Sequence, residues 1–232
     1  MPLKASERRP NNPVICFVGG PGTGKTTVAA QFPEPYFLDL DKNLSGPFDY
    51  VRDNTPGQLE KVTYDMVSLE EDPAAPDSFR EVPVERRFAR FEKLLSDAYT
   101  PSNPCKTVVI DSTTSLALVL ETKVRQMKNL GAHDKWEFEH WRLYLGIWTT
   151  LITQIRDRTK TTILCAHEEL EKNDLDQTVR KVLMISGQAK TAIPALVTDV
   201  WQFEIRKIIV PGKPPEHQRW INTQQDSKNP NL

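Results

Sequence analysis

The stretch "GGPGTGKTT", residues 19–27, holds four of the ten glycines of this chain. It lies between the apolar run VICFV (14–18) and the short apolar stretch VAAQF (28–32). The pattern G-x-x-x-x-G-K-[S/T] is met by Gly19, Gly24, Lys25 and Thr26. A strand before the pattern and a helix start after it are the context in which such a loop binds phosphate. The sequence therefore predicts a phosphate-binding loop, with an ordinary glycine-rich turn as the alternative.

The loop 19–27 has the groups that the phosphates of a nucleotide require. Backbone N–H groups of the glycine-rich turn point inward around the β-phosphate, and the helix start adds partial positive charge. We expect Lys25 to reach the β and γ oxygens and the Thr26 hydroxyl to bind Mg²⁺. ATP and Mg²⁺ are the predicted cofactors. The predicted nucleotide-binding residues are Gly19, Gly20, Pro21, Gly22, Thr23, Gly24, Lys25, Thr26 and Thr27.

The composition narrows the classes of partner and compartment. Thirty Lys and Arg against 31 Asp and Glu give a formal net charge of −1, so DNA contact requires a local basic patch. The cysteines Cys16, Cys105 and Cys165 are scattered, and two lie in apolar runs where a thiol behaves as a small hydrophobe. No apolar run approaches the ~18 residues of a membrane span. We expect a cytoplasmic protein that has no zinc site and does not bind membranes.

Strand-like and helical patterns alternate along the chain. Apolar residues at helical spacing occur in 84–99 and in 139–158. Strand-like runs recur at 14–18, 36–40, 61–67, 107–111, 161–166, 182–185 and 200–205. This alternation predicts an α/β fold with a mainly parallel central sheet, helices on both faces and antiparallel strands near the C-terminus. The expected segments are an N-terminal arm at 1–13, an ATPase domain at 14–223, a Pro-rich surface connection at 71–83 and a C-terminal tail at 224–232.

Carboxylates follow two of the predicted strands. The run TVVID (107–111) ends in Asp111, whose position suits a grip on Mg²⁺, although an aspartate there can also cap the following segment. The run YFLDLD (36–41) ends in Asp39 and Asp41. A carboxylate at this place can orient the water that attacks the γ-phosphate, and Asp41 is the favoured candidate. The alternative is that both acids only open the loop that follows.

This order of motifs resembles the RecA-type ATPase core. The resemblance covers about residues 14–210 and rests on the loop 19–27, the acid after the next strand, the strand ending in Asp111 and the run TTILCAHEE. The chain is most similar to short phage-encoded RecA-like proteins, identified as phage nucleotide-binding or single-strand-annealing proteins. Those cores carry a glutamate where this chain has Asp41, and the shorter side chain favours slow hydrolysis.

The resemblance also implies a role for His167, which ends the run TTILCA. RecA-type cores carry at this place a glutamine that senses the γ-phosphate and relays to a DNA-binding loop. A neutral histidine can likewise donate one hydrogen bond to a phosphate oxygen. The alternative is a surface or core histidine without a function in turnover. The catalytic residues that we predict are Lys25, Asp41 and His167.

In the RecA plan two loops face the axis of a ring or filament, and their counterparts here are about 126–136 and 168–181. Cations near these loops could bind DNA phosphates and a tryptophan could stack on a base, unless its ring is part of the core. The candidate DNA-binding residues are Lys123, Arg125, Lys128, Lys135, Trp136, Arg180 and Lys181. The implied partners are single-stranded DNA, further copies of the chain in a ring or filament, and a single-strand-binding protein. For a phage protein the compartment is the host cytoplasm.

Two lysines are candidates for a finger that enters a neighbouring subunit's nucleotide site. Lys190 begins an apolar segment, and Lys228 matches the lysine of the K-x-R finger that ring and filament members use. Pro230 stands at or near the place of the arginine, so a plain tail is the alternative.

The predicted activity is a DNA-dependent ATPase that anneals or exchanges strands. A nucleotide-switched loader or replication accessory ATPase needs the same core and stays an alternative. A P-loop kinase for small molecules is disfavoured, because an acid after the second strand has no duty in phosphate transfer to an acceptor.

Overall fold

The structure is a computed structural model that describes residues 12–75, 78–172, 178–209 and 215–223, with the backbone alone at 172 and 178–180. The strands of its main sheet are β1 (Val14–Gly19), β2 (Pro35–Asp39), β3 (Thr63–Met66), β6 (Thr107–Asp111), β7 (Thr161–Ala166), β10 (Asp199–Ile208) and β11 (Glu216–Asn222). They form a seven-stranded sheet in the order β11-β10-β1-β7-β6-β2-β3. All neighbouring pairs in it are parallel except β10 with β11, which confirms the predicted α/β fold with antiparallel strands near the C-terminus.

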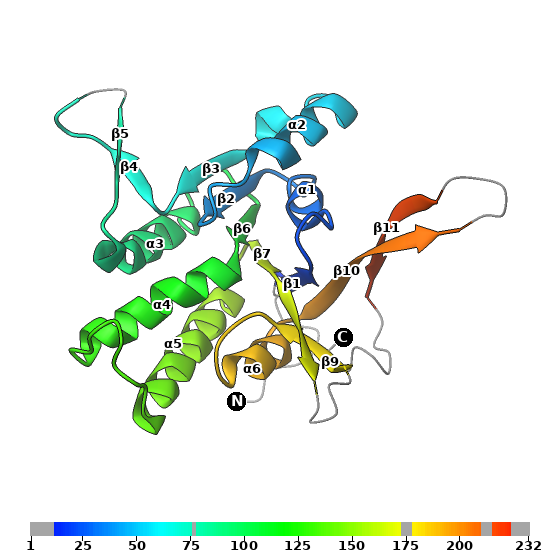
Figure 1. Cartoon of the computed structure of the whole chain (residues 1–232). Coiled ribbons are helices and arrows are strands. Elements are labelled where there is room, and N and C mark those ends of the chain that lie inside the picture. The colour runs from blue at the N-terminus through cyan, green and yellow to red at the C-terminus, as the bar shows by residue number, and fades with distance from the viewer. Residues whose placement is uncertain (1–11, 76–77, 173–177, 210–214, 224–232) are drawn as a thin grey trace, which may run out of the picture.

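Helices cover both faces of this sheet (Figure 1). The helices are α1 (Lys25–Ala29), α2 (Ser45–Asn54), α3 (Val84–Ala98), α4 (Thr113–Met127), α5 (Phe138–Arg156) and α6 (Ala189–Leu196). Helices α1 and α2 contribute to one hydrophobic core, and α3 to α6 contribute to the other. Helices α3 and α5 form where apolar residues at helical spacing predict them, because the buried stripe of each packs on the sheet.

Strand β1 shows how one strand serves both cores. Its six residues are all buried. Val14, Cys16 and Val18 point into the core beneath α3 to α6. Ile15 and Phe17 point into the core beneath α1 and α2. Side chains alternate between the faces of a sheet, so a strand covered on both sides is apolar throughout. This is why the central strands were recognisable as continuous apolar runs.

Four shorter strands lie outside the main sheet and form two separate hairpins. They are β4 (Leu69–Glu71), β5 (Phe79–Glu81), β8 (Glu168–Lys172) and β9 (Thr178–Leu183). The segment 71–83, predicted as a surface connection, is exposed at 79–81, but there it also forms a strand that pairs with 69–71. The candidate DNA loop at 168–181 is likewise the hairpin β8–β9. Backbone pairing stabilises these strands, which are polar except for the end of β9 at Val182 and Leu183.

Four further elements differ from the sequence-based expectations. The strand expected at 182–185 begins earlier, as β9, and ends at Leu183. Helix α2 and a short 3-10 turn, η2 (Leu59–Lys61), had no predicted counterpart. Strand β11 was missed as well, because its sequence EHQRWIN is mostly polar and exposed. It forms by pairing with β10 over the seven residues from Glu216 to Asn222.

The ends of the described chain bear on the N-terminal arm expected at 1–13 and on the candidate finger residue Lys228. Asn12 donates a side-chain hydrogen bond to the Thr159 carbonyl, and the Thr162 N–H donates to the Pro13 carbonyl at 3.0 Å. The chain is therefore held against the core from residue 12. Residues 1–11 and 224–232, including Lys228, lie outside the described residues. No helix formed by the described residues is long and apolar enough to cross a membrane.

Candidate nucleotide-binding site

A cavity of about 530 Å³ opens at the carboxyl ends of the central strands. Parallel α/β sheets bind their ligands at this edge, because loops from neighbouring strands converge there. The cavity brings together segments that are far apart in the chain. Its walls are residues 21–28, Gln31, Asp39, Asp41, Asn43, Leu44, Gly46, Pro47, Tyr50, Asp111, His167, Phe203, Arg219 and Ile221.

Two glycines of the loop are required by its geometry. A Cβ on Gly19 would lie 2.5 Å from the Phe203 carbonyl oxygen, because the backbone of β10 passes close to the end of β1. Gly24 precedes α1 with a φ of 101°, in the left-handed region that favours glycine. The Thr23 hydroxyl donates to the Gly20 carbonyl at 2.8 Å. The loop 19–27 is therefore a closed turn.

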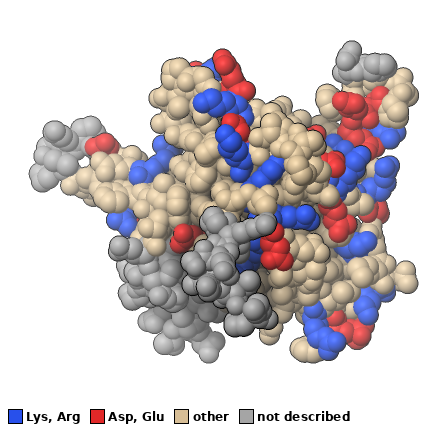
Figure 2. Space-filling model, turned by 180° about the vertical axis from the view of Figure 1, so that it is seen from behind, with Lys and Arg blue, Asp and Glu red and all other residues tan. Residues whose placement is uncertain are grey.

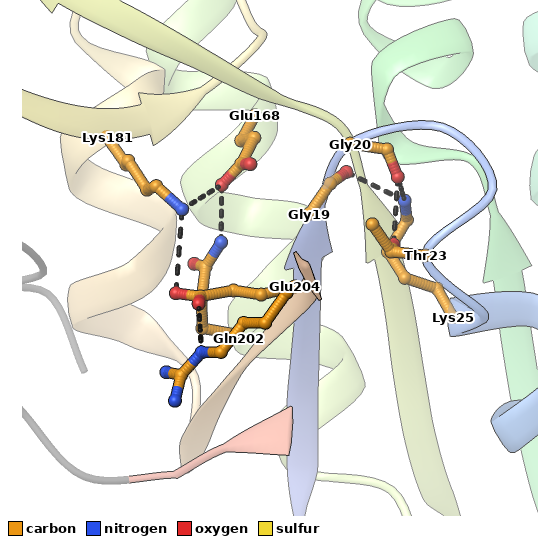
Figure 3. Close-up of polar contacts among 9 residues, drawn as sticks. Gly19, Gly20, Thr23, Lys25, Glu168, Lys181, Gln202 and Glu204 are labelled. Carbon is orange, nitrogen blue, oxygen red and sulfur yellow. Dashed lines mark hydrogen bonds and ion pairs between the residues drawn. The ribbon is translucent and has the colours of Figure 1, made fainter. Parts of the chain in front are cut away.

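Lys25 lies inside this turn. Its Nζ donates to the carbonyl oxygens of Gly19 at 2.8 Å and Gly20 at 3.0 Å (Figure 3). Burial lowers the pKa of Lys25, while the nearby acidic side chains of Asp111 and Asp41 raise it. The result is a buried cation next to the backbone N–H groups of a phosphate loop.

Thr26 and Asp111 are in direct contact. The Thr26 hydroxyl donates to Oδ2 of Asp111 at 2.6 Å. Burial raises the pKa of Asp111 to about 6, the hydrogen bond from Thr26 opposes the rise, and the charge of Asp41 adds to it. A hydroxyl beside a buried carboxylate is the oxygen-rich ligand set that Mg²⁺ prefers. The donor set thus fits the predicted cation, whose charge would offset the cost of ionising Asp111.

Asp39 and Asp41 have different surroundings. Oδ1 of Asp39 accepts hydrogen bonds from the backbone N–H groups of Asp41 at 2.9 Å and Lys42 at 2.8 Å. Asp39 therefore shapes the turn that follows β2. Oδ1 of Asp41 is buried and has no hydrogen-bond partner among the described residues. Of the two carboxylates, only that of Asp41 keeps a buried oxygen available for another group in the cavity.

His167 follows β7, which lies between β1 and β6 in the sheet. Its backbone N–H donates to the Thr114 hydroxyl at 3.1 Å, so the start of α4 holds its position. Its Nδ1 is buried and is bonded to no residue in the described part of the chain. Burial lowers the pKa of His167, and the charge of Lys25 lowers it further. A neutral imidazole therefore lines the cavity beside the phosphate loop.

The sequence-based search missed the wall formed by the C-terminal strands. Phe203 on β10 and Arg219 and Ile221 on β11 all line the cavity. Nε of Arg219 donates to the Gly22 carbonyl at 3.5 Å, although 197 positions separate them in the chain. No sequence motif predicts that these residues line the cavity, since they reach the loop only through strand pairing. On the other side Tyr50 of α2, also absent from the prediction, joins the wall.

The candidate DNA-binding residues of the first loop are largely engaged within the protein. Lys123 lies over the ring of Phe88, with Nζ 5.6 Å from the centroid. Arg125 lies 5.7 Å from the Trp136 ring centroid and donates to the Gly131 carbonyl at 2.5 Å.

The remaining residues of this loop differ from one another. Lys128 forms an ion pair with Glu139 at 3.2 Å, whereas Lys135 is exposed. The Trp136 ring packs against Trp141, with centroids 4.6 Å apart, and borders the core. This is the core packing that the sequence left open as the alternative to base stacking.

The later candidates are also paired with acids. Lys181 lies 3.5 Å from Glu168 and 3.6 Å from Glu204, as Figure 3 shows. Lys190 pairs with Glu171 at 3.1 Å. The side chain of Arg180 lies outside the described residues. On the face shown in Figure 2, basic and acidic side chains are interspersed, so that face carries no extended field of one sign.

Comparison with known families bears on this geometry. The family model described as an AAA domain matches residues 11–231. The chain belongs to this AAA-domain family. AAA domains are P-loop ATPases that generally bind ATP with Mg²⁺, which agrees with the cofactors expected from the loop. A search of the curated proteins found no match. The AAA domain spans nearly all of the chain, including the C-terminal strands that line the cavity.

Proposed function

We propose that this AAA domain hydrolyses Mg²⁺-ATP and couples hydrolysis to single-stranded DNA during strand annealing or exchange. The observation that carries the hydrolytic part is the buried Oδ1 of Asp41, which has no partner in the described part of the chain and lies in the same cavity as Lys25 and Asp111. A carboxylate left free beside a phosphate loop can accept a hydrogen bond from an attacking water. This is the position and the chemistry that a hydrolytic site requires.

The residues of the cavity divide the chemistry among them. Lys25 and the backbone N–H groups of the loop would hold the β- and γ-phosphates. Thr26 and Asp111 would hold Mg²⁺, which stabilises the charge that develops on the phosphate oxygens. Asp41 would orient the water and take its proton as the water oxygen bonds to the γ-phosphorus. The bond from that phosphorus to the bridging oxygen would break, and ADP would leave.

The coupling to DNA is proposed to pass through His167. This side chain lines the cavity and directly precedes the hairpin β8–β9. Glu168, the first residue of that hairpin, accepts a hydrogen bond from Gln202 of β10 and lies 3.5 Å from Lys181. A shift of His167 toward a phosphate would therefore act on a group of polar contacts that holds the hairpin in place.

DNA is proposed to bind through the exposed Lys135 and through Lys128 once its pair with Glu139 opens. Self-association in a ring or filament, with Lys190 or Lys228 as a finger, is proposed from the RecA resemblance, as is a single-strand-binding partner. A loader or accessory ATPase would use the same cavity and differ only in what hydrolysis drives.

The deciding experiment measures ATP turnover with Mg²⁺, with and without single-stranded DNA, alongside annealing of complementary strands. We expect DNA to change the turnover rate and ATP to change annealing. Lys25→Ala is the matched control and should abolish turnover, since no other residue in the loop can bring a cation to the β and γ oxygens. An ATP turnover rate that DNA does not change would contradict the recombination proposal. Wild-type turnover in Lys25→Ala would show that this cavity is not the site of hydrolysis.

A further inference from the structure

Arg219 faces the phosphate loop because of the register of the C-terminal strands. In the antiparallel pair β10–β11, Arg219 lies opposite Ile205, and Ile221 lies opposite Phe203. Residues opposite one another share a face of the sheet, as do residues two apart on one strand. The Phe203 ring packs against Phe17 on the side of the sheet covered by α1, with centroids 4.9 Å apart. Arg219 is thus on the same side as the loop 19–27.

The side chain of Arg219 reaches this loop from outside. Its Nε lies 3.5 Å from the Gly22 carbonyl oxygen. A Cβ built on Gly24 would be 3.4 Å from Cδ of Arg219. Lys25 bonds to the carbonyls of Gly19 and Gly20 in the interior of the same turn. Two cations thus approach one phosphate loop from different sides. Figure 1 shows β11 beside β10, and β10 lies between β11 and β1 in the sheet.

The charge of Arg219 is not neutralised within the described part of the chain, where no carboxylate lies within 4.0 Å of it. Arg206 on the opposite face of the same strand pair is a contrast. It forms an ion pair with Glu204 at 3.0 Å and lies 4.8 Å from the Trp220 ring centroid. The charge of Arg206 is thus offset by its neighbours. Arg219 borders the cavity, and among the described residues only its Nε has a hydrogen-bond partner.

We propose that Arg219 binds the phosphates of the nucleotide as a second cation of the site. A guanidinium presents paired N–H donors that match the oxygens of a phosphate, and it stays charged at any pH of interest. The assignment rests on the proposed nucleotide-dependent function. It also implies that nucleotide binding restrains β11, because the edge strand that carries Arg219 gains a contact with the ligand.

The test compares Arg219→Gln with Arg206→Gln, which removes the same charge from the opposite face. Two ligands are titrated with each variant and with wild type: ATP with Mg²⁺, and inorganic tripolyphosphate as a competitor for the same site. We expect Arg219→Gln to lower the affinity for both ligands by a similar factor of about 10 to 100, the range for a hydrogen bond to a charged group. Arg219→Lys should restore part of the affinity, and Arg206→Gln should bind both ligands as wild type does.

Several results would overturn this assignment. If Arg219→Gln weakens the binding of ATP but leaves the affinity for tripolyphosphate unchanged, the side chain contacts the base or ribose. If neither affinity changes, it contacts no part of the ligand. If wild type itself fails to bind ATP, the proposed function fails and the assignment fails with it. Amide hydrogen exchange gives a second measurement: ATP should slow exchange in 216–222 of wild type and not in Arg219→Gln.

Discussion

At the scale of single residues, the turn after β2 assigns different tasks to two aspartates. Asp39 accepts two backbone hydrogen bonds, whereas Oδ1 of Asp41 in the cavity accepts none from the residues that the structure describes. We expect Asp41→Asn to bind ATP normally and to lower kcat by about 10²- to 10⁴-fold, the usual contribution of a general base. Asp39→Asn should lower the melting temperature instead, because it weakens the turn. ATP titration, steady-state kinetics and thermal melting of both variants check this. The reverse assignment of phenotypes would show that Asp39 acts on the water.

Asp111 carries a second residue-scale prediction, on pH. Burial raises the pKa of Asp111 from 3.8 to about 6. Between these values the unfolded chain has released the proton and the folded protein keeps it, so stability falls as pH rises through this window. At about 1.4 kcal/mol per pKa unit, the ionised carboxylate costs the Mg²⁺-free protein about 3 kcal/mol at neutral pH.

Asp111→Asn should remove this cost, because it deletes the charge and keeps the shape. Without Mg²⁺, we expect the variant to exceed wild type in free energy of unfolding by up to about 3 kcal/mol above pH 6, and to have no such advantage below about pH 4. Urea denaturation in EDTA from pH 4 to 8 measures the difference. Magnesium-dependent turnover should fall in the same variant. A difference that does not vary with pH, or an unchanged magnesium dependence, would contradict this account of Asp111.

At the scale of elements, the end of β7 joins the cavity to the hairpin β8–β9. We expect His167→Ala to bind ATP and to hydrolyse it at a rate that DNA no longer changes, because the half-buried imidazole would link a phosphate to the hairpin. His133→Ala is a control, since His133 is exposed in the loop before α5. Turnover of both variants with and without single-stranded DNA is the measurement. Full DNA stimulation in His167→Ala would leave His167 a structural histidine.

At the scale of the whole molecule, a net charge of −1 means that DNA must bind through a local patch. Replacing Lys128 and Lys135 together by glutamine should weaken single-stranded DNA binding. The slope of log K against log salt should fall in magnitude by about 0.7 for each phosphate that these side chains no longer neutralise. Lys61→Gln with Lys106→Gln removes equal charge elsewhere and should change neither value. Binding isotherms at several salt concentrations check this, and ATP affinity should survive in both double variants.

Unchanged affinity and slope in the Lys128/Lys135 variant would rule out this surface, and the arm with Lys4, Arg8 and Arg9 would be tested next.

The variant Trp136→Ala distinguishes core packing of the ring from stacking of the ring on a base. The contacts of Trp136 with Trp141 and Arg125 lead us to expect a lower melting temperature. If the ring stacked on a base instead, DNA binding would weaken by about 1–3 kcal/mol with little change in stability or salt slope.

The sequence by itself determined the central strands and the phosphate loop with its lysine. These features depend on residues close together in the chain: a strand buried on both faces must be apolar throughout, and a phosphate turn needs glycines followed by lysine and threonine. The strand ending in Asp111 was readable for the same reason, and its contact with Thr26 follows from the parallel sheet.

Only the tertiary structure decided which groups are free to act. Whether Asp39 or Asp41 has an unused oxygen depends on the path of the turn after β2, which either acid could have shaped. Lys128, Lys181 and Lys190 read as available cations in the sequence, yet each faces a carboxylate brought to it by folding. Arg219 meets the loop across 197 positions through the register of an edge strand with no apolar pattern. Such contacts arise from strand pairing and packing between distant segments, so the local pattern of residues in the sequence does not predict them.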